Sequence, residues 1–338
     1  MLTRAKKKPI RILSIDGGGI RGILPGQILV ALEQITGKPI YESFDLIAGT
    51  STGGILAAAL LCPADPTNPG SGAKFTAKEA VDIYLKIGDE LFKQTIKQRI
   101  VSLGGLAEEK YDEKSLEKVL EKSLEELWLA DLLRPCLITA YDVRRRKLEF
   151  FNQYDAKSNK SKNFKLRDVA RATSAAPTFF EVARIYSESK VPYPLVDGGV
   201  FANNPTMCAY SEARSMSFPG RTDYPTARDM VILSLGTGGQ KTGYKYSKVK
   251  DWGAVAWIKP LIDIMMSGNS DTVDFQLRSI YDAIRRKKHY LRIDPLLGDA
   301  AQEMDDADEE NLIALKEAGI ESAEHNRKSL TDFAKLLD

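Results

Sequence analysis

Short runs of almost uninterrupted apolar residues recur along this chain, with helix-like segments between many of them. Segments 10–15 (IRILSI), 44–48 (FDLIA) and 230–236 (MVILSLG) are of this kind. A strand that is apolar on both faces has to be covered on both faces, which happens where helices pack on each side of a parallel sheet. The pattern therefore predicts an α/β fold with a mostly parallel central sheet.

The other elements predicted from periodicity complete one α/β domain with a helical C-terminal section. We divide the chain into a basic N-terminal extension at 1–8, a main domain at 9–300 and a C-terminal helix at 301–338 that packs on the same domain. Further strands are predicted at 136–143, 147–154, 193–199 and 289–294, and helices at 23–37, 76–92, 206–217, 253–286 with breaks, and 309–336.

Charge and cysteine content argue against several classes of protein. The 338 residues include 48 basic and 46 acidic side chains, a net charge of +2, so no surface for a nucleic-acid polymer is expected. The basic start is not followed by a long apolar segment, and apolar runs such as 55–62 are too short to span a bilayer. Three widely spaced cysteines, Cys62, Cys136 and Cys208, are typical of buried free thiols. These features predict a cytoplasmic protein.

A strand-like run leads directly into Gly49-Thr50-Ser51-Thr52-Gly53, and a helix of small residues follows. This is the G-x-S-x-G pattern between a strand and a helix that a nucleophile elbow requires. The turn is so tight that Gly49 and Gly53, two residues before and after the serine, must lack side chains. The pattern predicts Ser51 as a nucleophile, with a capped helix start as the alternative.

The glycine loop at 16–22 (DGGGIRG) follows the first predicted strand. It matches G-x-G-x-x-G, but it lacks the Lys-Ser/Thr pair of a phosphate-binding loop and the acidic strand end of a dinucleotide fold. An acyl-transfer serine, in contrast, needs backbone N–H groups for the developing oxyanion. We therefore predict an oxyanion hole at Gly17, Gly18 and Gly19, with Gly18 and Gly19 as the donors. Arg21 either supports this loop, adds positive potential beside it, or is a structural ion-pair partner.

Few residues could act as the base that activates the serine. Neither His289, at the start of a predicted strand, nor His325, on a charged helix, has the loop context usual for a catalytic histidine, so a Ser-His-Asp triad is not favoured. Asp197 ends an apolar strand and precedes Gly198 and Gly199, which places its carboxylate at a strand tip with little cover. A partly desolvated aspartate can accept the serine proton directly.

The chain resembles the patatin-like phospholipases, of the bacterial type, in five segments that follow the family's order. The resemblance implies a patatin-like three-layer α/β/α sandwich, with Ser51 and Asp197 as a catalytic dyad and 17–19 as the oxyanion hole. The main domain, 9–300, is then the catalytic domain. The five segments are 16–22 (DGGGIRG), 49–53 (GTSTG), 173–180 (TSAAPTFF), 197–205 (DGGVFANNP) and 233–238 (LSLGTG).

The same resemblance implies a carboxylic ester hydrolase that cleaves fatty-acyl esters of membrane glycerolipids through an acyl-enzyme on Ser51. It implies no cofactor and no metal. The expected partners are the membrane lipid substrate and, transiently, the inner face of the membrane. Several alternatives stay open: activation by a small molecule such as a cyclic nucleotide, self-association, a Ser-His-Asp esterase, and a non-catalytic binding protein.

Two further segments carry weaker patterns. Segment 251–268 gathers apolar and aromatic residues from Trp252 to Met266 near two lysines. Packing in the core is favoured for this segment over an interfacial lid or a membrane-docking helix. The acidic run 305–317 has the charge pattern of a calcium loop but not its glycine, so we interpret it as the acidic start of a helix.

Overall fold

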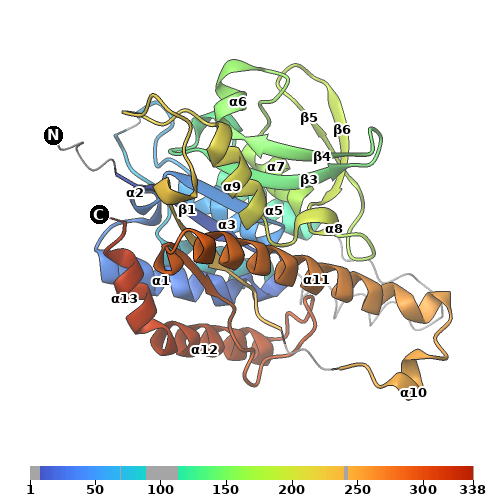
Figure 1. Ribbon diagram of the computed structural model, residues 1–338. Coiled ribbons are helices and arrows are strands. Elements are labelled where there is room, and N and C mark those ends of the chain that lie inside the picture. Colours follow the sequence, from blue (N-terminus) through green and yellow to red (C-terminus); the bar gives the residue numbers. More distant parts are fainter. Residues whose placement is uncertain (1–7, 69, 89–112, 240–242, 338) are drawn as a thin grey trace.

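The computed structural model describes residues 8–68, 70–88, 113–239 and 243–337. Its strands are β1 (Ile10–Ile15), β2 (Leu46–Thr50), β3 (Cys136–Asp142), β4 (Lys147–Asn152), β5 (Ala183–Tyr186), β6 (Pro192–Asp197), β7 (Met230–Leu235) and β8 (Tyr290–Ile293). They form one sheet with the order β5-β6-β3-β2-β1-β7-β8, and β4 pairs with β3 outside this path (Figure 1). The run from β3 to β8 is parallel, whereas β4, β5 and β6 join antiparallel. The predicted α/β fold with a mostly parallel sheet is confirmed.

Helices cover both faces of this sheet and so form two further layers (Figure 1). The helices are α1 (Ile23–Thr36), α2 (Ile40–Ser43), α3 (Thr52–Leu61), α5 (Glu113–Leu124), α6 (Gln153–Ser158), α7 (Leu166–Thr173), α8 (Gly199–Ala202), α9 (Thr206–Ser215), α10 (Tyr246–Val249), α11 (Ala254–Ala283), α12 (Glu309–His325) and α13 (Arg327–Ala334). Residues 77–88 are helical as well.

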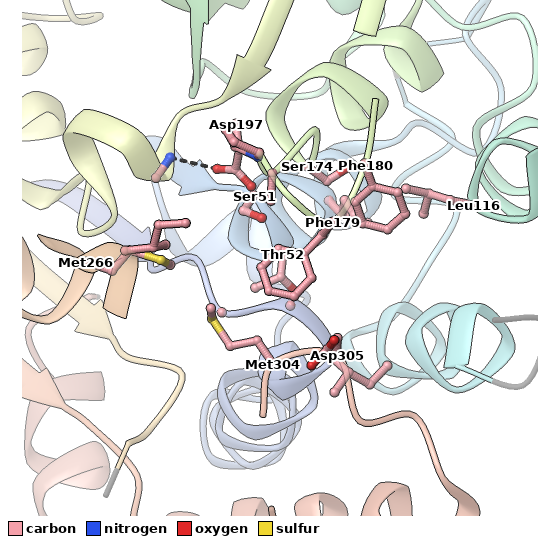
Figure 2. Close-up of a pocket in the computed structure, with 18 of the residues that line it drawn as sticks. Ser51, Thr52, Leu116, Ser174, Phe179, Phe180, Asp197, Met266, Met304 and Asp305 are labelled. Atoms are coloured by element: carbon pink, nitrogen blue, oxygen red, sulfur yellow. Dashed lines mark hydrogen bonds between the residues drawn. The ribbon is translucent and has the colours of Figure 1, made fainter. Parts of the chain in front are cut away.

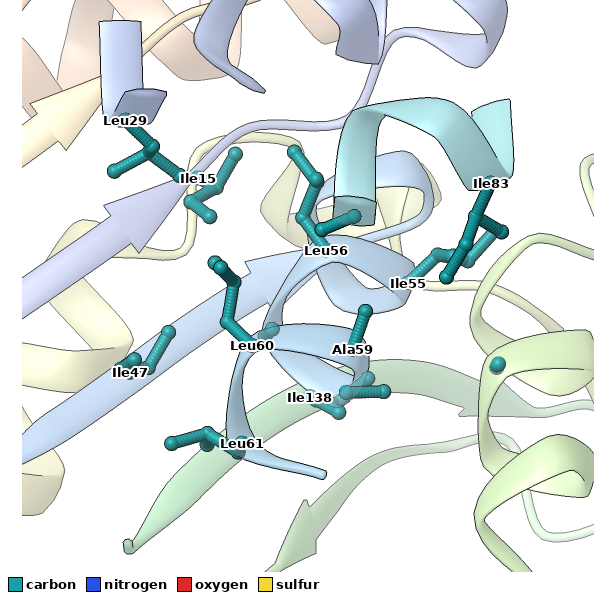
Figure 3. Packing of buried hydrophobic residues seen from close by; sticks show 14 of the residues in the cluster. Ile15, Leu29, Ile47, Ile55, Leu56, Ala59, Leu60, Leu61, Ile83 and Ile138 are labelled. Atoms are coloured by element: carbon teal, nitrogen blue, oxygen red, sulfur yellow. The ribbon is translucent and has the colours of Figure 1, made fainter. Parts of the chain in front are cut away.

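Alternate residues of β1 show why the core strands are apolar throughout. Leu13 and Ile15 belong to a buried cluster with residues of α1, α3 and α12, and Figure 3 shows the part of it around Ile15. Ile10 and Ile12 belong to a second buried cluster, with residues of α9 and α11. Both faces of the strand are therefore covered, as expected for a parallel sheet between two helical layers.

Helix α11 differs from its prediction in two ways. It is one continuous helix of 30 residues rather than a helix with breaks, although Pro260 lies inside it. Packing of Val273, Leu277 and Tyr281 in the second cluster holds its C-terminal half, and helix formation is cooperative, so the helix extends toward its N-terminus in spite of the proline. Core packing, favoured for 251–268, is wrong for much of that segment, because several of its apolar side chains are exposed.

Two smaller corrections concern a strand and the C-terminal section. The edge strand β5 was not predicted, because its alternation of buried and exposed side chains extends over only four residues. The predicted helix at 309–336 is two helices, α12 and α13, which meet at Asn326. Asp308 is the N-cap of α12, and Glu309 and Glu310 lie in its first turn, which confirms the acidic start of a helix. Within the residues described, no helix has both the length and the apolar character needed to cross a bilayer.

Candidate active site

Ser51 occupies the turn between β2 and α3. Its φ angle of 53° lies in a region that favours glycine, so the surrounding structure holds this serine in a strained conformation. A Cβ atom at Gly49 would collide with the carbonyl group of Gly53, and one at Gly53 would collide with the carbonyl oxygen of Ile15. Close backbone approach therefore requires both glycines. The segment has the strand–turn–helix geometry of a nucleophile elbow.

A threonine at the end of α7 ties this turn to the sheet. The N–H of Ser51 donates to Oγ1 of Thr173 at 2.9 Å, and the same hydroxyl donates to the carbonyl oxygen of Thr139 in β3 at 2.6 Å. The N–H of Ser51 is therefore not free to bind an oxyanion. Sequence analysis assigned Thr173 no role, because a contact across 122 positions leaves no local pattern.

The register of β3 brings Asp197 next to Ser51. Thr139 pairs with Thr50 of β2 on one side and with β4 on the other, and Ala140 pairs with Asp197 of β6 and again with β4. Strands β2 and β6 therefore pair with the same edge of β3. Strand β2 pairs with β3 as far as Thr139, and β6 pairs with it from Ala140 onward. The carboxylate that ends β6 consequently lies beside the serine that follows β2, although the two are far apart in the sequence.

The carboxylate of Asp197 is buried, and it accepts a hydrogen bond from the N–H of Gly199 at 2.7 Å (Figure 2). The hydroxyl of Ser51 lies beside it in the pocket wall and favours its ionised form. Burial raises the pKa of Asp197 from 3.8 to about 6, although the Ser51 hydroxyl and the Gly199 N–H act to lower it. A Cβ at Gly198 would collide with the Thr139 side chain, so the turn after the carboxylate needs this glycine. The result is a carboxylate that can accept a proton near neutral pH.

The glycine loop after β1 lies against the same turn. The N–H of Gly17 donates to the carbonyl oxygen of Asn203 at 3.0 Å, so Gly17 shapes the loop but has no free donor. The N–H groups of Gly18 and Gly19, in contrast, donate no hydrogen bond to any of the described residues, and both glycines line a pocket together with Ser51. Two unpaired backbone donors beside a serine hydroxyl are what an oxyanion hole provides.

Arg21 supports this loop from behind. Its side chain is buried, and its Nε donates to the carbonyl oxygen of Gly18 at 3.4 Å, while Nη1 donates to that of Gln302 at 3.2 Å. The guanidinium therefore links the loop to the segment before α12. Of the roles considered from the sequence, these contacts fit support of the loop.

A buried ion pair fixes the end of β1, from which the loop departs. Arg292 of β8 donates through Nη1 and Nη2 to the two carboxylate oxygens of Asp16, at 2.9 and 2.6 Å. Burial acts to lower the pKa of Arg292, but the charge of Asp16, the hydrogen bonds to it and the charge of Asp294 together outweigh burial and raise the pKa, so the guanidinium stays charged. Ser270 of α11 adds a third hydrogen bond, to Oδ2 of Asp16 at 3.2 Å. Arg292 and Ser270 were not singled out from the sequence.

Ser51 and Asp197 open into an apolar pocket of about 280 Å³ (Figure 2). Side chains from α3, α8, α11 and the segment before α12 contribute to its wall. Most of these side chains are aliphatic, aromatic or thioether groups, which favour a hydrocarbon ligand over a polar one. The apolar lining includes Ile20, Ile55, Ile87, Leu116, Phe179, Phe180, Val200, Ile262, Met265, Met266 and Met304.

Neither histidine of the chain lies in this pocket. His289 immediately precedes β8, where its Nδ1 lies 3.2 Å from the carbonyl oxygen of Met230 at the start of β7. Because these strands are parallel to β2, His289 lies at the opposite end of the sheet from Ser51. His325 is an exposed residue at the end of α12. The two histidines of this chain therefore do not complete a Ser-His-Asp triad with Ser51.

Ester hydrolases with an α/β fold use a serine on a strand–turn–helix, a carboxylate beside its hydroxyl and free backbone amides nearby. Residues 13–210 match the family described as "Patatin-like phospholipase". Patatin-like protein 2 of Arabidopsis thaliana is 36% identical, over 92% of this chain and 82% of the relative. Patatin-like protein 3 of the same plant is 34% identical, over 97% of this chain and 88% of the relative. The chain belongs to the patatin-like phospholipase family.

Family membership supports an ester hydrolase that acts on lipid acyl groups in general terms. The two relatives are plant proteins, so they lend no support to the bacterial type, which stays a prediction. Among solved structures, VipD from Legionella pneumophila aligns with 96% of this chain and 67% of its own, with a TM-score of 0.41 and 13% identity.

Proposed function

We propose that this protein is a phospholipase A-type lipid acyl hydrolase, with Ser51 as the nucleophile and Asp197 as the base. The observation that carries the proposal is the placement of the Ser51 hydroxyl beside the buried Asp197 carboxylate, close enough to act on its pKa, at the wall of an apolar pocket. A fatty-acyl chain is the apolar ligand that such a pocket accommodates, and its ester carbonyl would then lie beside the hydroxyl. The substrate class is accordingly the fatty-acyl esters of membrane glycerolipids.

Acylation begins when Asp197 takes the proton of the Ser51 hydroxyl, while the serine oxygen attacks the ester carbonyl carbon. The oxygen of the resulting tetrahedral intermediate accepts hydrogen bonds from the N–H groups of Gly18 and Gly19. The intermediate collapses, the carbon–oxygen bond to the lysolipid breaks, and protonated Asp197 gives its proton to the departing alkoxide. The acyl group is then an ester of Ser51.

Deacylation repeats these steps with water. Asp197 takes a proton from a water molecule while the water oxygen attacks the carbonyl carbon of the acyl-enzyme. The N–H groups of Gly18 and Gly19 again bind the oxyanion. Collapse releases the fatty acid and returns the proton to Ser51. Because Asp197 must be ionised at the start of each step, a pKa of about 6 predicts that kcat/KM falls about tenfold per pH unit well below pH 6.

The proposal is tested by incubating the purified protein with lipid extracts and with a soluble short-chain ester, and by measuring the carboxylic acid that is released. The wild type should release fatty acids, and Ser51→Ala should lose at least about a thousandfold in kcat/KM. Ser43→Ala is the matched control, since Ser43 is also a buried serine but does not line the pocket. Release of fatty acids by Ser51→Ala at the wild-type rate, or none by the wild type, would refute the proposal.

Activation of the enzyme by a small molecule such as a cyclic nucleotide remains a prediction from the family resemblance. No contact of the described residues specifically favours such activation. Activity of the wild type measured with and without cyclic nucleotides tests it directly. A non-catalytic binding protein would show no release of fatty acids under either condition.

A further inference from the structure

The N-terminal half of α11 leaves large apolar side chains uncovered. Ile258, Leu261, Ile264 and Met265 are 47, 48, 41 and 52% exposed. With 3.6 residues per turn, these four side chains fall within an arc of about 120° around the helix. We call them the α11 apolar face. Isolated exposed apolar residues are ordinary, but four on one helical arc mark a surface that meets another apolar phase.

The α11 apolar face continues into the pocket. Met265 belongs both to the face and to the pocket lining, and Ile262 and Met266 line the pocket from the adjacent arc of the same helix. Figure 2 shows Met266 directed toward the site from α11. An apolar surface therefore runs without interruption from the outside of α11 to the neighbourhood of Ser51.

The segment that precedes α11 has the composition of a water–lipid interface. Tyr246 is 82% exposed, and Lys245 and Lys248 beside it are exposed as well. Trp252 packs edge-to-face on Trp257 of α11, with ring centroids 5.1 Å apart. Tyrosine and tryptophan favour the level of lipid headgroups, and lysines next to an apolar face favour anionic headgroups.

The same helix is tied to the site through its next turns. Asn269 accepts a hydrogen bond from the N–H of Asn204 at 3.0 Å and donates to the carbonyl oxygen of Phe201 at 3.1 Å, so it holds the turn after Asp197. Ser270 donates to Asp16 beneath the glycine loop. A surface bound to the N-terminal half of α11 would therefore have a fixed orientation relative to the dyad.

We propose that the α11 apolar face, together with Lys245 and Lys248, is the surface by which this protein docks on an anionic lipid bilayer. An acyl chain then passes from the bilayer along Met265 and Met266 into the pocket. The inference rests on the proposed function for the identity of the substrate, but docking itself does not require turnover. A second copy of this chain fits the surface less well, because it would cover the way into the pocket and bring lysines of two chains together.

The test is vesicle flotation with the full-length protein carrying Ser51→Ala, so that no lipid is consumed. Vesicles are phosphatidylcholine alone or phosphatidylcholine with phosphatidylglycerol. The double variant Ile258→Ser/Leu261→Ser should bind the anionic vesicles at least about tenfold more weakly. The matched control is Ile313→Ser/Ile320→Ser, which changes two similarly exposed isoleucines on α12 and should leave binding unchanged.

In the catalytically intact protein, the same double variant should hydrolyse a soluble short-chain ester within about twofold of the wild-type rate, because neither Ile258 nor Leu261 lines the pocket. Equal vesicle binding by the double variant and the control would overturn the proposal. The proposal would also be overturned if the wild type were a dimer, the double variant were a monomer, and both bound vesicles equally. If the wild type did not hydrolyse the ester, the proposed function would be refuted instead. The flotation result would still show whether the α11 apolar face binds the bilayer.

Discussion

Asp197→Asn should gain stability relative to the wild type as the pH rises from 5 to 8, and it should abolish hydrolysis. In the native state the pKa of Asp197 is raised by burial from 3.8 to about 6. Between these two pH values the native state still holds a proton that the unfolded state has released. The free energy of unfolding therefore falls as pH rises through this window, and it stays lower above it.

The size of this cost follows from the two pKa values. The difference between 3.8 and about 6 corresponds to about 3 kcal/mol at pH 8, at about 1.4 kcal/mol for each unit of pKa. About half of it, on the order of 1 to 2 kcal/mol, develops between pH 5 and pH 8. An asparagine at 197 carries no charge, so the variant should gain about this amount of stability over the wild type on going from pH 5 to pH 8.

Urea unfolding of both proteins at pH 5 and pH 8 measures this change, and the subtraction removes every effect of the substitution that does not depend on pH. Ser51→Ala is the informative control. It should abolish hydrolysis but keep the buried carboxylate, and it removes the hydroxyl that acts to lower the pKa of Asp197, so its pH-dependent cost should be retained or increased. A stability difference between Asp197→Asn and the wild type that is the same at both pH values would refute the reasoning.

Two substitutions test the framework of the site. Gly53→Ala places a Cβ against the carbonyl oxygen of Ile15 and should abolish ester hydrolysis and lower Tm, whereas Gly239→Ala, where a Cβ meets nothing within 4 Å, should change neither. Arg292→Met leaves Asp16 buried without its cation and should lower the free energy of unfolding by about 3–5 kcal/mol in urea, and a loss below about 1 kcal/mol would contradict the role of this ion pair.

The parts of the site that sequence analysis could predict are those with a local signature. Ser51 lies inside a five-residue G-x-S-x-G turn, and Asp197 lies between an apolar strand and two glycines. Each pattern is complete within a few residues. The α/β fold was predictable for a similar reason, because a strand that is buried on both faces is apolar at nearly every position of its own sequence.

The contacts that hold these residues in place were not predictable in this way. Thr173 meets the elbow across 122 positions and Arg292 meets Asp16 across 276, so neither pairing leaves a trace in the neighbouring sequence. The continuity of α11 was missed because Pro260 is a local signal against a helix, while the packing of its C-terminal half is a property of the assembled fold.

The shared edge of β3 has a consequence for how this chain can change during evolution. Because β2 and β6 both pair with β3, the loops between β3 and β6 can grow or shrink without moving the carboxylate away from the hydroxyl, provided that β4 and α7 keep their places. A shift of β6 by a single position, in contrast, would set Val196 or Gly198 where Asp197 now stands. Insertions should therefore be tolerated in those loops and selected against inside the six residues of β6.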